Sequence, residues 1–345
     1  RVKKIYIENK KELTSMLATD LRYKDIDDIL GSREQRFFGS GFKKVNHQIY
    51  DIEVSEKCVV ATADISYPTD WSKKSEDTDL KPHLSTIDAT VLSLQLNEVY
   101  IMQKFGITEA QRRKIWLKRI VLKAGTTPQE DLNKLIISTQ HIKTKNVSDS
   151  LGTNVSIFES QIGSMQIRCE IEHDIEKECN EGAKFDSIDQ ILGLHSKRYY
   201  GDMYKNPQQI MEDVQFDFQN QKVTSLVNVT HINESPFKVE GMEAAYYPSF
   251  SIIDCMITVA QMAQALIYKV DDIDRSNSNT LWMRKVIIEN KNPYQPYEPF
   301  VASTYISKSN LLKLKGSMWR TTEMFGEYKN YSLHYYLAHE LPSVD

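Results

Sequence analysis

The sequence predicts an α+β fold made of two tandem copies of one unit, each a curved antiparallel sheet wrapped around a long central helix. Three observations support this prediction. Short motifs recur in the same order in both halves of the chain, each half holds one long apolar segment, and alternating β-branched segments flank that segment. We place the first unit at residues 1–180 and the second at residues 181–345.

The recurring motifs keep a nearly constant spacing. IDDILG at Ile26–Gly31 returns as IDQILG at Ile188–Gly193 (188 − 26 = 162). PHLSTIDATVLSLQ from Pro82 aligns without a gap with PSFSIIDCMITVAQ from Pro248 (248 − 82 = 166). Chance rarely produces ordered matches whose offsets drift so little, so the sequence indicates an internal duplication.

Each copy begins with a short helix and a pair of strands. The helix ends at the Leu-Gly of IDxILG, because glycine is common just beyond a helix C-terminus. The segments 45–54 and 58–66 then alternate apolar and polar residues, as the strands of a hairpin do. The second copy repeats the pattern at 214–219 and 222–231.

A long apolar helix is predicted next, over 84–103 in the first copy and 250–270 in the second. A helix that is apolar on nearly every side is a buried one, so a sheet must cover it. The second helix is about long enough to span a bilayer, but it carries Asp254 and Gln261. Polar side chains are costly in hydrocarbon, so we predict a buried helix of a soluble protein.

Further alternating segments complete each copy, at 114–122, 133–143, 154–161 and 164–172, and at 281–289, 299–307, 311–323 and 331–339. Two strands, one long helix and three or four strands is the order of a hotdog module. We expect the two sheets to join edge to edge, because pairing covers an exposed strand edge.

The composition argues against several classes of function. The net charge is −4 without long runs of one sign, whereas a general nucleic-acid binder needs a basic face. The four cysteines form no CxxC and no metal-ligand cluster, and no nucleotide-binding or zincin motif occurs, so we expect no cofactor and no metal. The N-terminus lacks the apolar core of a secretory signal. We expect a cytoplasmic monomer or homodimer that binds no membrane.

Three residues are candidates for catalysis. Asp88 and Asp254 each lie one turn into a predicted buried helix, where burial can shift the pKa of a general acid or base. Each is also preceded by serine at the third position before it, the pattern of a capping box that only satisfies helix N–H groups. His83 lies five residues before Asp88, and its counterpart in the second copy is Ser249. We predict that His83 and Asp254 share one site, with side chains less than about 8 Å apart.

Six further residues are candidates for substrate binding: Ser249, Gln95, Gln261, Trp116, Trp282 and Arg284. The two glutamines are polar groups in buried helices, so they must hydrogen-bond either to the backbone or to a ligand. The tryptophans fit either a strand core or the wall of a ligand channel. The arginine fits either a phosphate or carboxylate site or an exposed strand surface.

Residues Tyr246–Lys285, with PSFSIIDCMITVAQ and SNSNTLWMRK, resemble the avirulence D (AvrD) proteins of plant-pathogenic bacteria. Separately, the spacing from His83 to Asp88 resembles the catalytic aspartate motif of polyketide-synthase dehydratase domains, which are double hotdogs. In those domains the histidine comes from the first hotdog and the aspartate from the second, which maps onto His83 and Asp254. The chain lacks the Gly- and Pro-rich loop that follows the dehydratase histidine.

The AvrD resemblance implies an enzyme that makes acylated, sugar-derived signal molecules. Its substrates would be a β-ketoacyl thioester, carried on an acyl carrier protein or CoA, and a short ketose that accepts the acyl group. The alternatives are a hotdog dehydratase or thioesterase that acts on an acyl thioester, and a module that binds an acyl chain without catalysis.

Overall fold

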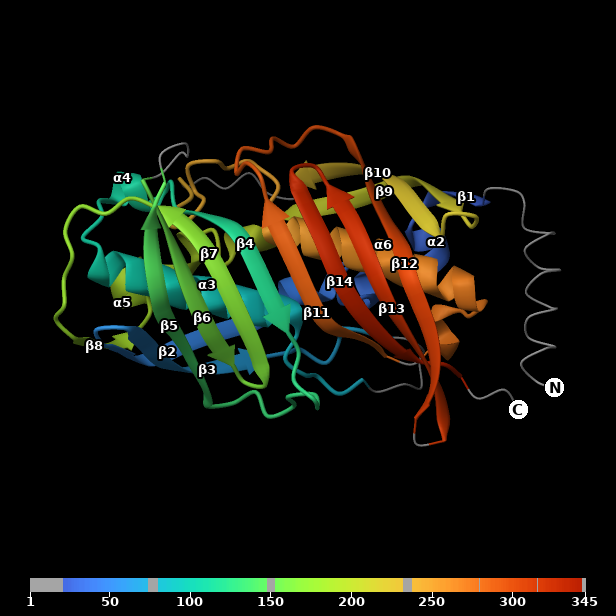
Figure 1. Cartoon of the computed structure of the whole chain (residues 1–345), viewed down its shortest axis with the longest axis horizontal. Helices are drawn as coiled ribbons and strands as arrows, with labels where there is room; N and C mark the ends of the chain where they lie inside the picture. The colour runs from blue at the N-terminus through green and yellow to red at the C-terminus, as the bar shows by residue number, and fades with distance from the viewer. Residues whose placement is uncertain are drawn as a thin grey trace.

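The computed structural model describes residues 21–73, 80–147, 153–231, 238–278, 280–314 and 316–342. The N-terminal segment considered above for a secretory signal lies outside these ranges. Two elongated halves lie side by side, and each contains one long helix covered by strands (Figure 1).

Fourteen described strands form a single antiparallel sheet in the order β1-β9-β10-β12-β13-β14-β11-β4-β7-β6-β5-β3-β2-β8. The strands of the first half are β1 (Leu21–Asp25), β2 (Asn46–Val54), β3 (Cys58–Ser66), β4 (Trp116–Lys123), β5 (Leu135–Asn146), β6 (Asn154–Ile162) and β7 (Met165–His173). Those of the second half are β8 (Ala183–Ser187), β9 (Pro207–Asp217), β10 (Lys222–His231), β11 (Leu281–Asn290), β12 (Phe300–Leu314), β13 (Ser317–Tyr328) and β14 (Tyr331–Glu340).

Two long helices lie inside the curved sheet, α3 (Thr86–Lys104) and α6 (Ile252–Asp271). Helix α3 contacts β2, β3, β5, β6 and β7, and α6 contacts β9, β10, β12 and β13. Both helices are buried along most of their length. No helix in the described ranges is long and apolar enough to cross a membrane.

Three short α-helices and five 3₁₀ turns complete the described elements. They are α2 (Asp27–Leu30), α4 (Glu109–Arg112) and α5 (Asp189–Leu192), with 3₁₀ turns at Arg33–Gln35, Gly41–Lys44, His195–Lys197, Met203–Lys205 and Arg275–Asn277. Helices α2 and α5 end at Gly31 and Gly193, as expected. The φ angles of Gly31 and Gly193, 77° and 78°, lie in the region that favours glycine.

The halves join where β4 pairs with β11, so the expected edge-to-edge sheet is present. Val121 pairs with Ile287, which lies at the offset of the recurring sequence motifs (287 − 121 = 166). The register is reciprocal about this pair and runs from Arg119 opposite Glu289 to Lys123 opposite Lys285. The junction therefore has local twofold symmetry.

The first strand of each half pairs with the sheet of the other half. Strand β1 pairs with β9, and β8 pairs with β2. The exchange is reciprocal, because Asp25 lies opposite Glu212 and its counterpart Ser187 lies opposite Tyr50. Helix α2 likewise contacts α6, and α5 contacts α3. Each half is thus completed by a segment from the other.

Two lysines make a second reciprocal contact between the halves. Lys43 Nζ donates to the Pro207 carbonyl at 2.7 Å, and Lys205 Nζ donates to the Val45 carbonyl at 2.8 Å. Both partners are related by the same offset (205 − 43 = 162; 207 − 45 = 162). These bonds hold the residue before β2 and the first residue of β9 against the opposite half.

The strand predictions needed two corrections. Strand β9 begins at Pro207, not at residue 214, because Gln208–Ile210 pair with β10 although they lack a clear apolar alternation. Residues 311–314 belong to β12, not to β13, because the turn lies at Gly316, whose φ is 93°. Strands β1 and β8 were not predicted.

Candidate functional site

Asp88 closes the N-terminus of α3 as a capping box. The Ser85 backbone N–H and hydroxyl donate to Asp88 Oδ2 at 2.9 and 2.6 Å, and the Asp88 N–H donates to Ser85 Oγ at 3.1 Å. The local interpretation of Ser-x-x-Asp is therefore correct, because these bonds satisfy N–H groups that the helix leaves free.

The Asp88 carboxylate has two further partners. His47 Nε2 lies 2.8 Å from Oδ1, and the Tyr67 hydroxyl donates to Oδ2. Burial acts to raise the pKa of Asp88, but the hydrogen bonds from His47, Ser85 and Tyr67 outweigh burial and lower it below its ordinary value. This carboxylate is held in its charged form.

Asp254 caps α6 in the same way but has fewer partners. The Ser251 N–H and hydroxyl donate to Oδ2 at 2.7 and 2.8 Å, and Gln209 Nε2 donates to Oδ1. Asp254 is fully buried. Burial raises its pKa to about 6, against the Ser251 hydrogen bonds and the charge of Lys43. Its charge can therefore change near neutral pH.

Several tyrosines lie near enough to Asp254 to interact with its charge. For five of them burial raises the pKa of the phenol and the negative charge of Asp254 adds to the rise: Tyr199, Tyr247, Tyr297, Tyr328 and Tyr331. Glu243 is also close enough to act on Asp254 electrostatically, and burial raises its own pKa to about 7. The raised pKa values keep the phenol groups near Asp254 protonated at neutral pH.

His83 contacts the second half of the chain. Its half-buried ring lies 5.4 Å from the ring of Trp282 and 6.3 Å from that of Trp71. The Tyr67 hydroxyl, which donates to Asp88, also lies 3.2 Å from the His83 carbonyl oxygen. Among the residues described, no hydrogen bond or ring contact joins His83 to Asp254, so their pairing stays a prediction.

Both glutamines of the long helices bind protein groups of the opposite half. Gln95 Oε1 accepts from Arg198 Nη1 at 2.7 Å, and Gln261 Nε2 donates to the Phe38 carbonyl at 3.1 Å. Arg198 and Phe38 lie in two similar segments that are 162 residues apart, RYYG at Arg198–Gly201 and RFFG at Arg36–Gly39. These contacts satisfy the Gln95 oxygen and the Gln261 Nε2 group, whereas the buried Gln261 Oε1 has no hydrogen-bond partner among the described residues. A role of either glutamine in substrate binding stays a prediction.

Three further candidates contact protein groups distant or near in sequence. Ser249 Oγ accepts from the Gln295 N–H at 3.2 Å, and the exposed Arg284 donates to the Gly125 carbonyl at 3.2 Å. Trp116 is buried in β4, with Lys118 Nζ 5.0 Å from its ring centre. Substrate binding by these residues also stays a prediction.

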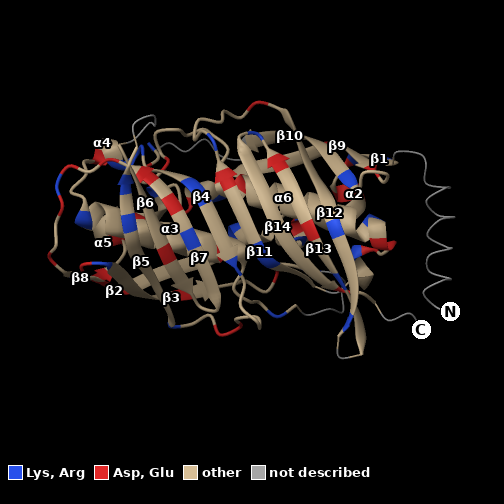
Figure 2. Ribbon diagram, in the orientation of Figure 1, with Lys and Arg blue, Asp and Glu red and all other residues tan. Residues whose placement is uncertain are grey.

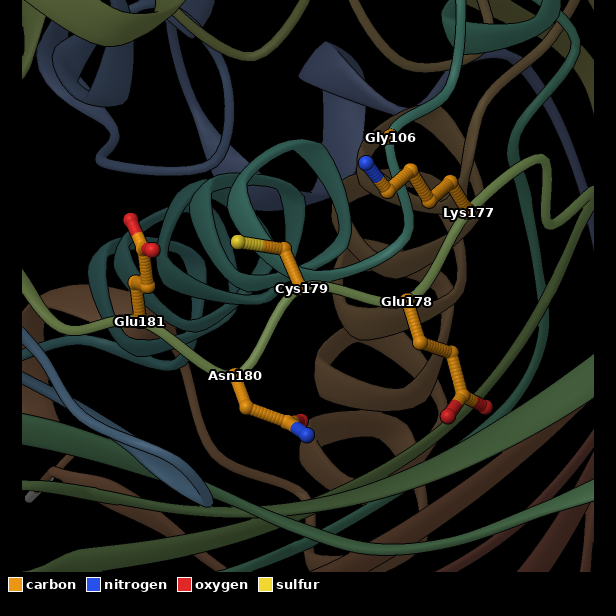
Figure 3. Close-up of a pocket in the computed structure, with 6 residues that line it drawn as sticks. All are labelled: Gly106, Lys177, Glu178, Cys179, Asn180 and Glu181. Atoms are coloured by element: carbon orange, nitrogen blue, oxygen red, sulfur yellow. The ribbon is translucent and has the colours of Figure 1, made fainter.

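The surface hollow in Figure 3 does not contain these groups. It lies beyond the C-terminal end of α3, and Gly106 and residues 177–181 line it. We place the candidate site at the two aspartates, because they are buried titratable groups at helix N-termini with shifted pKa values. No three His, Cys, Asp or Glu side chains of the described ranges are grouped so as to hold a metal ion.

Sequence reasoning missed His47, Tyr67, Gln209 and Lys43. One signal was available, because His47 lies in the predicted strand 45–54 and alternates with the buried Ile49 on its inward face. Gln209 is the counterpart of His47 (209 − 47 = 162). The offset of the repeat could therefore have marked both as neighbours of the helix N-termini.

Residues 21–342 match the family described as Pseudomonas avirulence D protein (AvrD). The chain belongs to the AvrD family. A search of curated protein sequences finds no match to this AvrD-family chain.

Several solved structures are similar to this AvrD-family chain at low identity. The dehydratase domain of PpsC from Mycobacterium tuberculosis, in complex with C12:1-CoA, has a TM-score of 0.39 and 6% identity and covers 85% of this chain and 98% of its own. A hot dog fold protein of unknown function from Alicyclobacillus acidocaldarius has a TM-score of 0.37 and 6% identity. The match covers 85% of this chain and 96% of that protein's chain. The tesB protein of Mycobacterium avium subspecies paratuberculosis has a TM-score of 0.38 and 6% identity. The match covers 84% of this chain and 95% of the tesB chain. Likenesses at this level carry no argument about activity.

Charged residues of both signs are mixed along the ribbon of this AvrD-family chain. Figure 2 shows Lys and Arg interspersed with Asp and Glu along the strands, without a continuous basic stripe on the face in view. A protein that tracks a nucleic-acid backbone needs such a stripe.

Proposed function

We propose that this AvrD-family protein is a biosynthetic enzyme that transfers the acyl group of a β-ketoacyl thioester to a hydroxyl of a short, sugar-like acceptor. The thioester would be carried on an acyl carrier protein or CoA. One observation supports this most directly: Asp254 is fully buried at the N-terminus of α6, and burial raises its pKa to about 6. General bases work best when their pKa lies near the working pH.

In the proposed reaction Asp254 takes the proton of the acceptor hydroxyl. The hydroxyl oxygen attacks the thioester carbonyl carbon and forms the new C–O bond. The carbonyl oxygen becomes an oxyanion. First-turn N–H groups of α6 that are not used by the capping box, in which the Asp254 N–H donates to Ser251 Oγ, can stabilise it because the helix itself leaves them free. The intermediate then expels the thiolate, and the proton on Asp254 passes to the sulfur.

The fold supports an acyl-thioester site of the double-hotdog kind, with residues 1–180 and 181–345 as the two repeats. Both halves have the same order of long elements, and the pairings of β4 with β11, β1 with β9 and β8 with β2 are reciprocal. We interpret this symmetry as a duplication. It brings the counterpart residues Thr90 and Met256 into contact at 3.7 Å, near the N-terminal ends of α3 and α6.

His83 and Asp88 have different proposed roles. His83 lies in a half-buried aromatic group with Trp282, where it can contact a substrate that enters between the halves. Asp88 is held in its charged form by His47 and Tyr67, so it can orient neighbouring groups but is poorly suited to gain and lose a proton near neutral pH.

One observation favours a second candidate, hydrolysis or dehydration of an acyl thioester. The contact between His47 and Asp88 joins an imidazole to a carboxylate, and such a pair can shuttle a proton to or from water or a β-hydroxyl. In that case His47 would be essential and no acceptor sugar would be needed.

The two functions are separated by mass spectrometry of small molecules from bacterial cells that express the wild type, Asp254→Asn or His47→Ala. Acyl transfer through Asp254 predicts an acylated, sugar-derived product that only Asp254→Asn abolishes. Free acid or enoyl products that depend on His47 would instead support the second candidate.

A further inference from the structure

The hairpin of β12 and β13 extends beyond the strands on either side of it. The ladder between β10 and β12 ends where Lys222 lies opposite Tyr305, and the ladder between β13 and β14 ends where Trp319 lies opposite Glu340. From Lys308 to Leu314, β12 therefore pairs with β13 alone. Figure 1 shows this end of the hairpin projecting past the neighbouring strands.

The projecting end carries exposed apolar side chains on both of its faces. Residues directly opposite each other in an antiparallel pair share a face, so Leu312 lies with Trp319 on one face, whereas Met318 lies with Lys313 on the other. Leu311, Leu312, Leu314 and Met318 are 37%, 43%, 50% and 41% exposed. We call these four residues and Trp319 the apolar tip. A cluster of this kind marks a contact surface for a protein or a membrane.

The same segment is basic. Residues 299–322 contain three lysines and Arg320 but no aspartate or glutamate, although the net charge of the whole chain is −4. Arg320 is paired at the base of the hairpin, where its Nε donates to both carboxylate oxygens of Asp271 at 2.7 Å. Lys308 and Lys313 are exposed beside the apolar tip. The projecting end thus combines apolar side chains with an excess of positive charge.

Charge favours one partner for this surface. Two copies of the tip would repel each other, and lysines along an unpaired strand edge discourage pairing with another chain. A single protein groove would cover one face of the hairpin and leave the leucines or methionine of the other face in water. An anionic lipid surface attracts lysine, and its headgroup region accepts leucine and tryptophan. Long lysine side chains also let the ammonium group stay at the lipid phosphates while apolar neighbours lie deeper.

We infer that the projecting end of the β12–β13 hairpin docks this protein on an anionic lipid surface. The apolar tip enters the headgroup region, and Lys308 and Lys313 bind lipid phosphates. The hairpin lies at the surface of the bilayer and does not cross it. The expectation that the chain binds no membrane considered a spanning helix, and this contact is of a different kind. It is independent of the proposed acyl transfer.

Sedimentation of the purified full chain with lipid vesicles tests the inference. One set of vesicles is phosphatidylcholine, and the other is a mixture of phosphatidylcholine and phosphatidylglycerol. We expect binding to the mixed vesicles that weakens as salt is added, because salt screens the attraction, and much weaker binding to phosphatidylcholine alone. Tryptophan emission should shift to shorter wavelength on binding. Trp319→Phe should still bind but lose most of that shift.

Two double variants separate the apolar and the charged contributions. Leu312→Asp with Leu314→Asp should abolish binding to the mixed vesicles. Lys308→Gln with Lys313→Gln should weaken it roughly 25-fold, because each lysine near an anionic surface contributes about fivefold in affinity.

Val301→Asp is the matched control. Val301 is also an exposed apolar residue of β12, but it lies at the opposite end of the strand. This variant should bind the mixed vesicles like the wild type. The melting temperature of each variant shows whether it is folded, and the Trp319 emission shift is a second measurement that needs no added charge.

The outcomes decide the inference without reference to the reaction. Failure of the wild type to bind the mixed vesicles would overturn it, and so would binding that the leucine and lysine substitutions leave unchanged. Self-association that Leu312→Asp with Leu314→Asp abolishes, without vesicle binding, would assign the tip to contacts between copies and overturn it as well. Because the assay contains no thioester, acyl transfer can fail while the docking surface is confirmed.

Discussion

The imidazole of His47 lies 2.8 Å from Asp88 Oδ1, and the counterpart residue Gln209 donates to Asp254 in the same way. One centre thus joins a carboxylate to a basic ring, and the other joins it to a neutral amide. This difference accounts for the opposite directions in which the pKa values of the two aspartates are shifted.

Asp254→Asn should abolish product formation while leaving the fold nearly intact. As a cap, asparagine still accepts hydrogen bonds from helix N–H groups, so the free energy of unfolding should fall by no more than about 1 kcal/mol. As a base it is inactive, and loss of general-base help lowers turnover by about a hundredfold or more. Turnover and melting temperature are measured on the same preparation, and loss of both together would mean that Asp254 is chiefly structural.

The pKa of Asp254 predicts how stability depends on pH. In the folded protein the pKa is raised to about 6, so the folded state binds a proton that the unfolded chain releases. Wild-type stability should therefore fall as pH rises from 4 to 7, by on the order of 3 kcal/mol for this group alone. Asp254→Asn should lack this part of the decline. Denaturant unfolding at pH 4, 5.5 and 7 measures it, and parallel profiles for the two proteins would contradict it.

Asp88 has the opposite dependence. Its folded pKa is lowered, so it contributes stability above its unfolded pKa and loses that contribution as pH falls through the folded value. Asp88→Asn should therefore destabilise the protein at pH 7 by roughly 1–3 kcal/mol, because His47 and Tyr67 lose a charged acceptor. The loss should shrink in acid. An Asn variant as stable as the wild type at pH 7 would show that the His47 contact contributes nothing.

Tyr23 should stabilise the second half of the chain although it lies in the first. Its ring contacts Phe216 of β9 at 5.9 Å, and Lys269 Nζ of α6 lies 5.1 Å from the ring centre. Tyr23→Ala should therefore reduce hydrogen-exchange protection in β9 and α6 more than in β2 and α3. Lys24→Ala, at the neighbouring exposed position, is the control. Equal loss of protection in both halves would argue against a local effect of the exchanged strand.

Local patterns predicted much of this fold. The capping boxes of α3 and α6, the glycines that end α2 and α5, and the pair β2 and β3 all depend on residues close together in sequence. The exchange of β1 and β8 could not be predicted in this way. Each strand has only five residues without a buried apolar face, and its partner lies in the opposite half of the chain.

Only the locally encoded part of the candidate site could be predicted from the sequence. Asp88 and Asp254 were identified because they follow a local serine pattern at helix starts. Their partners His47, Tyr67 and Gln209 are separated from them by 41, 21 and 45 residues. Which strand residue faces a carboxylate depends on the register of the sheet around the helix, and that register is set by tertiary packing.

The exchanged strands also affect how the chain can fold during synthesis. Leu21 pairs with Phe216 (216 − 21 = 195), so β1 leaves the ribosome long before its partner exists. At translation rates of about 5–20 residues per second, this strand waits for roughly ten to forty seconds. The first half meanwhile lacks its own edge strand until β8 is made. Strand β8 follows β7 by only nine residues, so the first half can complete its sheet soon after it is made, whereas β1 stays without its partner until β9 is made.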